Sequence, residues 1–383
     1  MPPEADLACR DAALAELATI VLPEELGLRR DHIMPSDERG PEFDDRYDFR
    51  TLIYDALHLP RARRLALIAP KLLNLESVIR TADIRLDGRP VRPTRILRRR
   101  RYDVVMLRAA TPPAELALAF GGWSAALRLP AAETACFAGR NCLMTVSQDN
   151  SLRWIRDWVR YHVAEHGVDA VLFYDNASRA YEPDELLATL AGVAGLAAVR
   201  VVSVPLPYGA FPLRGSRSRA LFLQTALWNI ARLRFLRDAR AVLPVDVDEL
   251  VTRSGDRSVF DAAVQSRGGY VKFRGKWRTH RLGPDQEPLH RDHAFLPERP
   301  TSCPMKYCVA PSGWLRRNPW NTHGLSWVPF SRAFESDEFG YLHCHGITTH
   351  WKSAGSRRSL PAGALDAPTE ALLQRHFAAD APL

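Results

Sequence analysis

The middle of the chain alternates short apolar runs with amphipathic segments, and this alternation constrains the fold more than any other feature. Four runs have the length of strands, and three intervening segments place apolar residues at helical spacing: the runs are 142–147, 168–174, 197–203 and 241–245, and the segments 152–163, 183–194 and 218–235. Asn150 or Ser151 stands where the first helix would begin, and Gly167 where it would end. Strands that alternate with helices predict an α/β fold with a mainly parallel sheet flanked by helices.

Residues 1–136 follow a different pattern. The stretch 8–22 has the spacing of a short helix, and after it come short apolar runs separated by turn residues, as in 87–90 (Asp-Gly-Arg-Pro). We therefore expect two domains, a small accessory domain with β content at 1–136 and the α/β domain at 137–383.

Composition limits the class of protein without selecting a function. The 383 residues include 52 Lys and Arg against 44 Asp and Glu, and a net charge of +8 is compatible with nucleic acid, an anionic membrane or a phosphorylated small substrate. The longest uncharged stretch, 186–199, is 14 residues long, whereas a membrane span needs about 20 apolar residues. The start of the chain lacks the pattern of a signal peptide. We expect a cytoplasmic protein without a transmembrane span, with peripheral contact at the inner face of the membrane as the other location that the charge allows.

Acidic and amide side chains follow three of the four apolar runs. Because parallel strands present their carboxyl ends at one edge of a sheet, these side chains are expected to gather where α/β proteins bind ligands. Closely spaced carboxylates are costly there unless a cation is near, and a hard divalent cation takes carboxylate and phosphate oxygens. This pattern predicts a metal–diphosphate site. The side chains are Gln148, Asp149 and Asn150, then Asp175 and Asn176, then Asp246, Asp248 and Glu249.

The order and spacing of these groups resemble the family 2 and family 92-like glycosyltransferases with a GT-A fold, many of whose bacterial members act in capsule or surface-polysaccharide synthesis. The resemblance covers about 140–358 and departs from the family at Gln148-Asp149, where Asn-Glu is usual. It rests on Ser147-Gln148-Asp149-Asn150, Trp154-Ile155, Tyr161-His162, Gly167-Val168, Tyr174-Asp175-Asn176-x-Ser178, Asp246-Val247-Asp248-Glu249, the run 305–309, and His345-x4-His350-Trp351-Lys352.

The resemblance implies a transferase, hexosyltransferase-like and inverting, that moves a sugar from a nucleotide-diphosphate donor to a hydroxyl of a glycan or a related acceptor. The expected donor is a UDP-sugar and the expected cofactor is Mn²⁺ or Mg²⁺, with no nucleic acid as partner. By position, Asp246 and Asp248 would face the ribose and the ion, with Asp248 the more direct ligand, and His345 or His350 would complete the metal shell. The donor-binding residues would be Gln148, Asp149, Asp175, Asn176, Arg217, Arg219 and Asp246.

An inverting transferase also needs a carboxylate as general base for the acceptor hydroxyl. Of the carboxylates that follow the metal motif we favour Glu287 and Asp292, which lie in a stretch rich in His and Arg; the other candidates are Asp285, Glu335, Asp337 and Glu338.

The sequence is compatible with three other functions. A non-catalytic protein that binds RNA or another anionic polymer would use the excess of arginine, and a degenerate transferase-like protein would bind a donor without turnover. A haloacid-dehalogenase-like phosphatase would use Asp246 as nucleophile, but Leu250 occupies the position of its Thr or Val, and Asp246 follows the fourth run rather than the first.

Two further groups have both a functional and a structural interpretation. Cysteine and histidine at 303, 308 and 343–345 offer zinc ligands or buried small side chains. Trp314, Trp320 and Trp327 offer stacking faces for an acceptor sugar or ordinary core residues.

Overall fold

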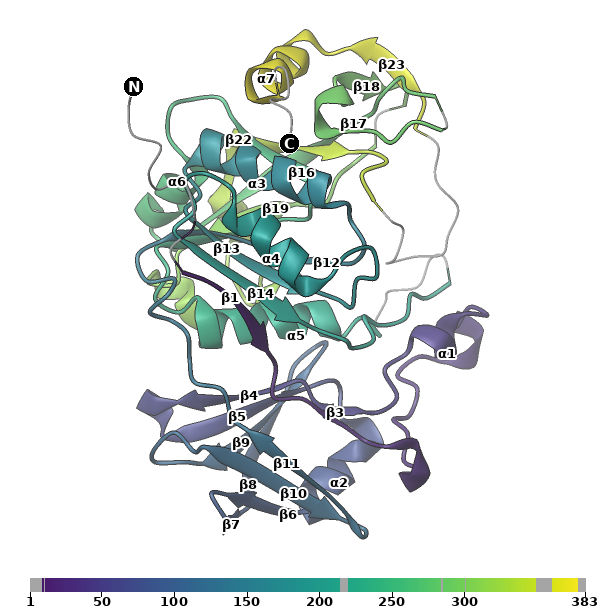
Figure 1. Cartoon of the computed structure of the whole chain (residues 1–383), viewed down its shortest axis with the longest axis vertical. Helices are drawn as coiled ribbons and strands as arrows, with labels where there is room; N and C mark the ends of the chain where they lie inside the picture. The colour runs from purple at the N-terminus through teal and green to yellow at the C-terminus, as the bar shows by residue number, and fades with distance from the viewer. Residues whose placement is uncertain are drawn as a thin grey trace. The chain divides into compact units, whose positions relative to one another are not determined.

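The computed structural model describes residues 9, 11–213, 220–283, 285–299, 301–348 and 360–377. The chain forms two compact units, each built from separate segments (Figure 1). The larger unit comprises 1–15, 135–203 and 238–383, and the smaller unit comprises 16–134 and 204–237. Within the described residues, no helix is long and apolar enough to cross a membrane.

The larger unit is built on a nine-stranded sheet, and the expected α/β fold is confirmed. Strands β14, β13, β12 and β15 run parallel to one another, and β17 runs parallel to β22. Strand β19 is antiparallel to β15 and β17, and β16 is antiparallel to β22. Across the sheet the order is β1 (Asp11–Glu16), β14 (Ala198–Ser203), β13 (Ala170–Asp175), β12 (Asn141–Ser147), β15 (Ala241–Pro244), β19 (Lys306–Val309), β17 (Tyr270–Arg278), β22 (Glu335–Cys344) and β16 (Glu249–Arg253).

The sheet is flanked by helices α3 (Leu152–His166), α4 (Pro183–Ala191), α6 (Val259–Gln265) and α7 (Ala367–Phe377) (Figure 1). Every residue of β13 is buried, as expected of a central strand in a parallel sheet that helices cover. Helix α3 has the predicted ends. The Ser151 hydroxyl accepts a hydrogen bond from the backbone N–H of Trp154 at 3.3 Å, and Gly167 ends the helix in the left-handed region at φ 69°.

The smaller unit is largely antiparallel β-structure. Its two four-stranded sheets enclose a separate hydrophobic core that includes Leu67, Val105 and Leu116. One sheet has the order β4 (Asp55–Leu59), β5 (Arg64–Ala69), β9 (Asp103–Arg108), β8 (Pro93–Arg98), and the other β11 (Trp123–Arg128), β10 (Glu115–Phe120), β6 (Asp83–Leu86), β7 (Arg89–Val91). Its shorter elements are β2 (Ile20–Val21), β3 (Thr51–Ile53), α1 (Phe43–Arg46), α2 (Glu76–Thr81) and α5 (Leu223–Ile230), which continues as a π-helical turn, Ala231–Phe235.

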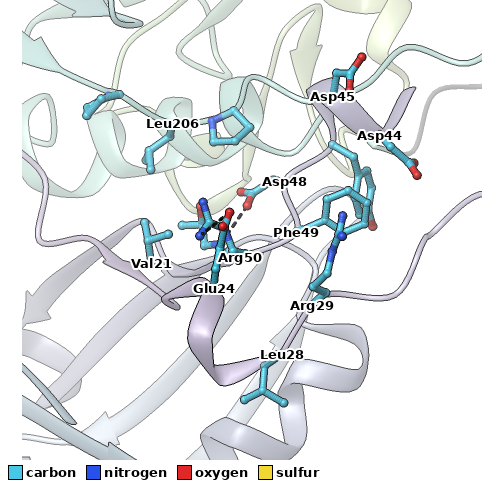
Figure 2. Close-up of a pocket in the computed structure, with 15 residues that line it drawn as sticks. Val21, Glu24, Leu28, Arg29, Asp44, Asp45, Asp48, Phe49, Arg50 and Leu206 are labelled. Carbon is cyan, nitrogen blue, oxygen red and sulfur yellow. Dashed lines mark hydrogen bonds and ion pairs between the residues drawn. The ribbon is translucent and has the colours of Figure 1, made fainter. Parts of the chain in front are cut away.

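A pocket of about 740 Å³ lies within this smaller unit (Figure 2). Its wall combines the Glu24–Arg50 ion pair, 3.1 Å between Oε1 and Nη1, with the Arg29 guanidinium, 3.9 Å above the Phe49 ring. Apolar side chains such as Leu206 complete the wall. Every residue that lines this pocket belongs to the smaller unit, whereas the predicted donor and metal residues that the structure describes belong to the larger one.

Two features of the fold differ from the sequence-based expectation. The predicted helix at 8–22 is wrong, because its described residues form β1 and β2. Strand β1 is held at the edge of the large sheet by tertiary contacts, among them a 2.7 Å ion pair between Asp11 and Arg200 of β14, and such contacts override a local helical pattern.

The second difference concerns the expected division between residues 136 and 137. Residues 1–15 join the larger unit, and residues 204–237 join the smaller one. A fully buried ion pair fixes the second segment, since the Arg234 guanidinium lies 3.1 Å from the Asp55 carboxylate of β4.

Candidate functional site

The carboxyl ends of β12, β13 and β15 lie at one edge of the large sheet. Ser147 of β12 is paired in register with Asp175 of β13, and Met144 of β12 with Pro244 of β15. The residues that follow these strands are the ones that the sequence singled out, and they form two groups.

The first group shapes the loop after β13. The Asp149 carboxylate accepts hydrogen bonds from the backbone N–H groups of Arg179 and Ala180, while the Asp175 carboxylate accepts from the Ser178 hydroxyl at 2.6 Å and the Ser178 backbone N–H at 3.1 Å. Burial raises the pKa of Asp175, against the opposing effect of these hydrogen bonds. The two predicted donor-binding carboxylates thus brace one short loop from two strand ends.

Gln148 and Asn176 belong to the same group. The Gln148 side-chain amide donates to the Ala177 carbonyl at 3.4 Å, and the Asn176 backbone N–H donates to the Ser147 carbonyl at 2.8 Å. The structure therefore brings together the four predicted donor-binding residues at the ends of β12 and β13. Arg217 and Arg219, also predicted to bind the donor, lie outside the described residues.

The second group surrounds Asp246, Asp248 and Glu249, which lie after the end of β15 and at the start of β16. The Lys306 ammonium lies 2.7 Å from the Asp246 carboxylate and 2.7 Å from the Glu249 carboxylate. The His343 Nε2 atom lies 3.0 Å from Asp248 Oδ2.

Strand pairing explains why these distant residues meet. Lys306 is the first residue of β19. His343 lies near the end of β22, opposite Glu249 of β16 on one side and opposite Trp277 of β17 on the other. The Trp277 ring stacks on the His343 ring with centroids 3.7 Å apart.

The charges in this second group are strongly coupled. Burial opposes a charge on Lys306, but the carboxylates of Asp246 and Glu249 outweigh it and raise the pKa of the ammonium. Burial likewise opposes a charge on His343, yet Asp248 raises the pKa of the imidazole to about 10. Burial raises the pKa of Glu249, an effect that Lys306 counteracts. At neutral pH the protein therefore supplies Asp246 and Asp248 with one cationic partner each.

Three side chains of this group suit a divalent cation. Asp248, Glu249 and His343 each offer a ligand atom, and these atoms lie within 4.8 Å of one another. Carboxylate oxygens suit Mn²⁺ and Mg²⁺, and an imidazole adds a nitrogen donor. Because a ligating histidine must be neutral, metal binding would release the proton that His343 carries. The residues present therefore fit the expected ion.

The predicted metal residues divide into three cases. Asp248 is one of the three side chains that suit the ion, and Asp246 forms an ion pair with Lys306 beside them. His345 is not one of the three. Its backbone N–H donates to the Arg278 carbonyl at 2.9 Å, and its carbonyl lies 2.8 Å from His293 Nε2. His350 lies outside the described residues.

The candidate bases lie on a segment that contacts the Asp246–Glu249 turn. His290 Nε2 lies 2.8 Å from the Val247 carbonyl, and the Trp154 indole N–H at the start of α3 donates to the Pro288 carbonyl at 2.8 Å. Asp292 is partly buried and accepts a hydrogen bond from the Leu289 backbone N–H at 2.8 Å, whereas Glu287 is exposed. This segment is therefore attached to the Asp246–Glu249 turn and to the start of α3.

The two remaining sequence motifs are only partly brought together. Cys303 Sγ lies 3.9 Å from His343 Nδ1, but Cys308 and Cys344 are buried, and burial raises the pKa of each thiol. No cysteine joins a set of three metal-ligating side chains among the residues that the structure describes. Trp320 is buried, whereas Trp314 and Trp327 are exposed.

Comparison with known proteins shows distant likenesses to solved structures. No family model matches the chain, and no curated protein matches it. Among solved structures, S. aureus TarS in complex with UDP is 12% identical over 39% of this chain and 38% of its own, with a TM-score of 0.24. An active-site mutant of LgtC is 14% identical over 46% of this chain and 60% of its own, with a TM-score of 0.27. The chain thus spans less than two thirds of either structure, and the functional argument rests on its own residues.

Proposed function

We propose that the chain is a glycosyltransferase that moves a sugar from a UDP-sugar to a hydroxyl group of a glycan or related acceptor, with Mn²⁺ or Mg²⁺ as cofactor. The observation that carries the proposal is the arrangement of Asp246, Asp248 and Glu249 with Lys306 and His343 beside the carboxyl edge of a parallel sheet. That edge is where α/β proteins bind their ligands. The order of motifs in the sequence points to the same activity.

Asp248, Glu249 and His343 would hold the ion, and Lys306 would keep Asp246 in place beside it. A bound divalent cation stabilises the negative charge that develops on a departing diphosphate. No nucleophile of the protein is needed for such a transfer. The protein's part is to position the donor and to keep the charged groups in fixed places.

The first group at the strand ends would bind the nucleoside part of the donor. Asp175 and Asn176 lie at the base of the braced loop, and Asp149 fixes that loop from the neighbouring strand. Gln148 would contribute to the same subsite, and Arg217 and Arg219 would face the diphosphate.

The acceptor hydroxyl must lose its proton as it attacks the sugar. Asp292 or Glu287 would accept that proton as the general base. The His290–Val247 and Trp154–Pro288 contacts support this assignment, because they attach the segment that carries both carboxylates to the Asp246–Glu249 turn and to the start of α3.

The ion pairs favour one alternative, a site that works or binds without metal. Lys306 and protonated His343 already neutralise part of the acidic group, as a bound cation would. A transferase-like protein with this internal compensation would bind a donor without added metal, with or without turnover.

The test is release of UDP from a panel of UDP-sugars, measured with Mn²⁺ and with a chelator, with and without a mixture of glycan acceptors. We expect Mn²⁺-dependent release that Asp248→Asn abolishes. Asp256→Asn is the matched control, because Asp256 is exposed in the turn after β16. Release that persists in chelator would favour the metal-free alternative, and unchanged release in Asp248→Asn would refute the assigned site.

A further inference from the structure

The segment 311–334 of the larger unit exposes an unusual set of aromatic side chains. Trp314 is 58% exposed, Trp327 67% and Phe330 89%. They are the aromatic members among the large hydrophobic side chains that are exposed in the described parts of the chain. Trp320, between them in sequence, is fully buried and anchors the segment. The Ser326 backbone N–H donates to the Pro319 carbonyl at 2.8 Å and the Asn318 side-chain amide donates to the Ser326 carbonyl at 2.7 Å, so the two parts of the segment that carry these rings lie side by side. Large apolar side chains gathered on a surface mark an interaction site more often than scattered single ones do.

The exposed rings project from a segment that the fold holds firmly. The Tyr307 hydroxyl donates to the Asn321 carbonyl at 2.9 Å, and the Leu325 backbone N–H donates to the Tyr270 hydroxyl at 3.2 Å. These bonds attach the hairpin of β20 (Trp320–Asn321) and β21 (Gly324–Leu325) to β19 and β17.

Two of the rings are also presented at a conformational cost. Trp327 and Phe330 have φ of 56° and 50°, in the left-handed region that bulky residues rarely adopt. Neither ring is buried in the larger unit. Strained residues at an exposed position indicate a use outside the folded chain.

The charge of the segment is one-sided. Arg316, Arg317 and Arg332 are exposed, and no Asp or Glu occurs from 299 to 334. The next acid, Glu335, lies 3.0 Å from Arg274 and 3.6 Å from Lys272, so its charge is offset. The segment that carries the rings is therefore rich in arginine and contains no acidic residue of its own.

We propose that this aromatic–arginine surface, formed by Trp314, Arg316, Arg317, Trp327, Phe330 and Arg332, binds the interface of an anionic lipid membrane. Tryptophan and phenylalanine partition to the headgroup level of a bilayer, and arginines add attraction to anionic lipids. An anionic polymer in solution would engage the arginines but would give no role to a phenylalanine that is 89% exposed. The inference does not depend on the proposed transferase activity.

The test is sedimentation of the full-length chain with extruded vesicles, without nucleotide or metal. One set of vesicles is phosphatidylcholine alone, and the other is an equimolar mixture with phosphatidylglycerol. We expect binding to the anionic vesicles, weakened about tenfold or more in Trp327→Asn/Phe330→Asn. Both side chains are exposed, and asparagine tolerates a positive φ, so the fold should persist. Circular dichroism checks that it does.

Two controls separate the sources of binding. Val264→Ser removes an exposed apolar side chain of α6 elsewhere in the same unit and should leave binding unchanged. Arg316→Gln/Arg317→Gln should weaken binding and make it less sensitive to salt. Undiminished vesicle binding in the aromatic double variant would overturn the proposal. The proposal would also be overturned if the wild-type chain bound soluble heparin but did not bind the vesicles.

Discussion

Lys306→Met removes the cation that lies between two carboxylates. The ammonium is 2.7 Å from Asp246 and from Glu249, and the side chains of Lys306 and Glu249 are each only 2% exposed. Methionine keeps most of the volume but leaves Glu249 with a buried charge that has lost its ion-pair partner. Breaking a buried pair in this way costs about 3–5 kcal/mol, and we expect a loss of that size at pH 7. Asp246, with a side chain that is 21% exposed, should contribute less because water reaches it.

The loss should depend on pH in a definite direction. Without Lys306, burial raises the pKa of Glu249, and the smaller effect of the His343 cation is what still opposes this shift. A raised pKa means that the native state takes up a proton more readily than the unfolded state. The stability lost in Lys306→Met should therefore be partly recovered as the pH falls from 7 towards 5.

Hydrogen exchange followed by mass spectrometry is the suitable assay, because peptides from β16 and β22 report on the larger unit alone. Lys272→Met is the matched control. Its ammonium lies 3.6 Å from a Glu335 side chain that is 28% exposed, and such a pair contributes about 1 kcal/mol or less. Adding Glu249→Gln to Lys306→Met should restore much of the loss, since it removes the unpaired charge. A cost no larger than that of Lys272→Met, or no recovery in the double variant, would refute the reasoning.

Three further predictions concern the fold. His166 donates from Nε2 to the Val251 carbonyl at 2.9 Å, and burial lowers its pKa to about 4, so the unfolded state alone holds its proton between pH 6.5 and 4. As the pH falls from 6.5 to 4, the free energy of unfolding measured in urea should fall by about 3 kcal/mol more in the wild type than in His166→Gln. Parallel pH profiles of the two proteins would contradict this prediction. Arg234→Met should destabilise the smaller unit by about 3–5 kcal/mol, because Asp55 would remain buried and unpaired; unchanged hydrogen exchange in β4 and β5 would count against it. Gly167→Ala places a Cβ in open space at φ 69°, so thermal unfolding should show only the backbone cost of about 1 kcal/mol, and a much larger loss would point to an unrecognised contact.

The parts of the fold that were predictable depend on local pattern. The four parallel strands follow from continuous apolar runs, because a strand covered on both faces, such as β13, has no polar face to show. The ends of α3 follow from Ser151 and Gly167. Strand β1 and the segment 204–237 were not predictable, since their places depend on partners such as Arg200 and Asp55 far along the chain.

The candidate site divides in the same way. Asp149, Asp175, Asp246 and Asp248 were predicted from the ends of local apolar runs. The partners of the last two, Lys306 and His343, were not assigned to the site. The sequence places Lys306 in an apolar run and His343 between other histidine and cysteine residues, and only the pairing of β22 with β16 sets His343 opposite Glu249.

The most direct measurement is a thermal shift with UDP, GDP and CDP, each with and without Mn²⁺, on the wild type and on Asp248→Asn. A ligand that binds only the native state raises the melting temperature. We expect a rise with UDP that needs Mn²⁺ and disappears in Asp248→Asn, while Asp256→Asn behaves as the wild type. A rise with UDP that is equal without Mn²⁺ and in Asp248→Asn, or no rise with any of the three nucleotides, would contradict a metal-dependent nucleotide-sugar site at Asp248.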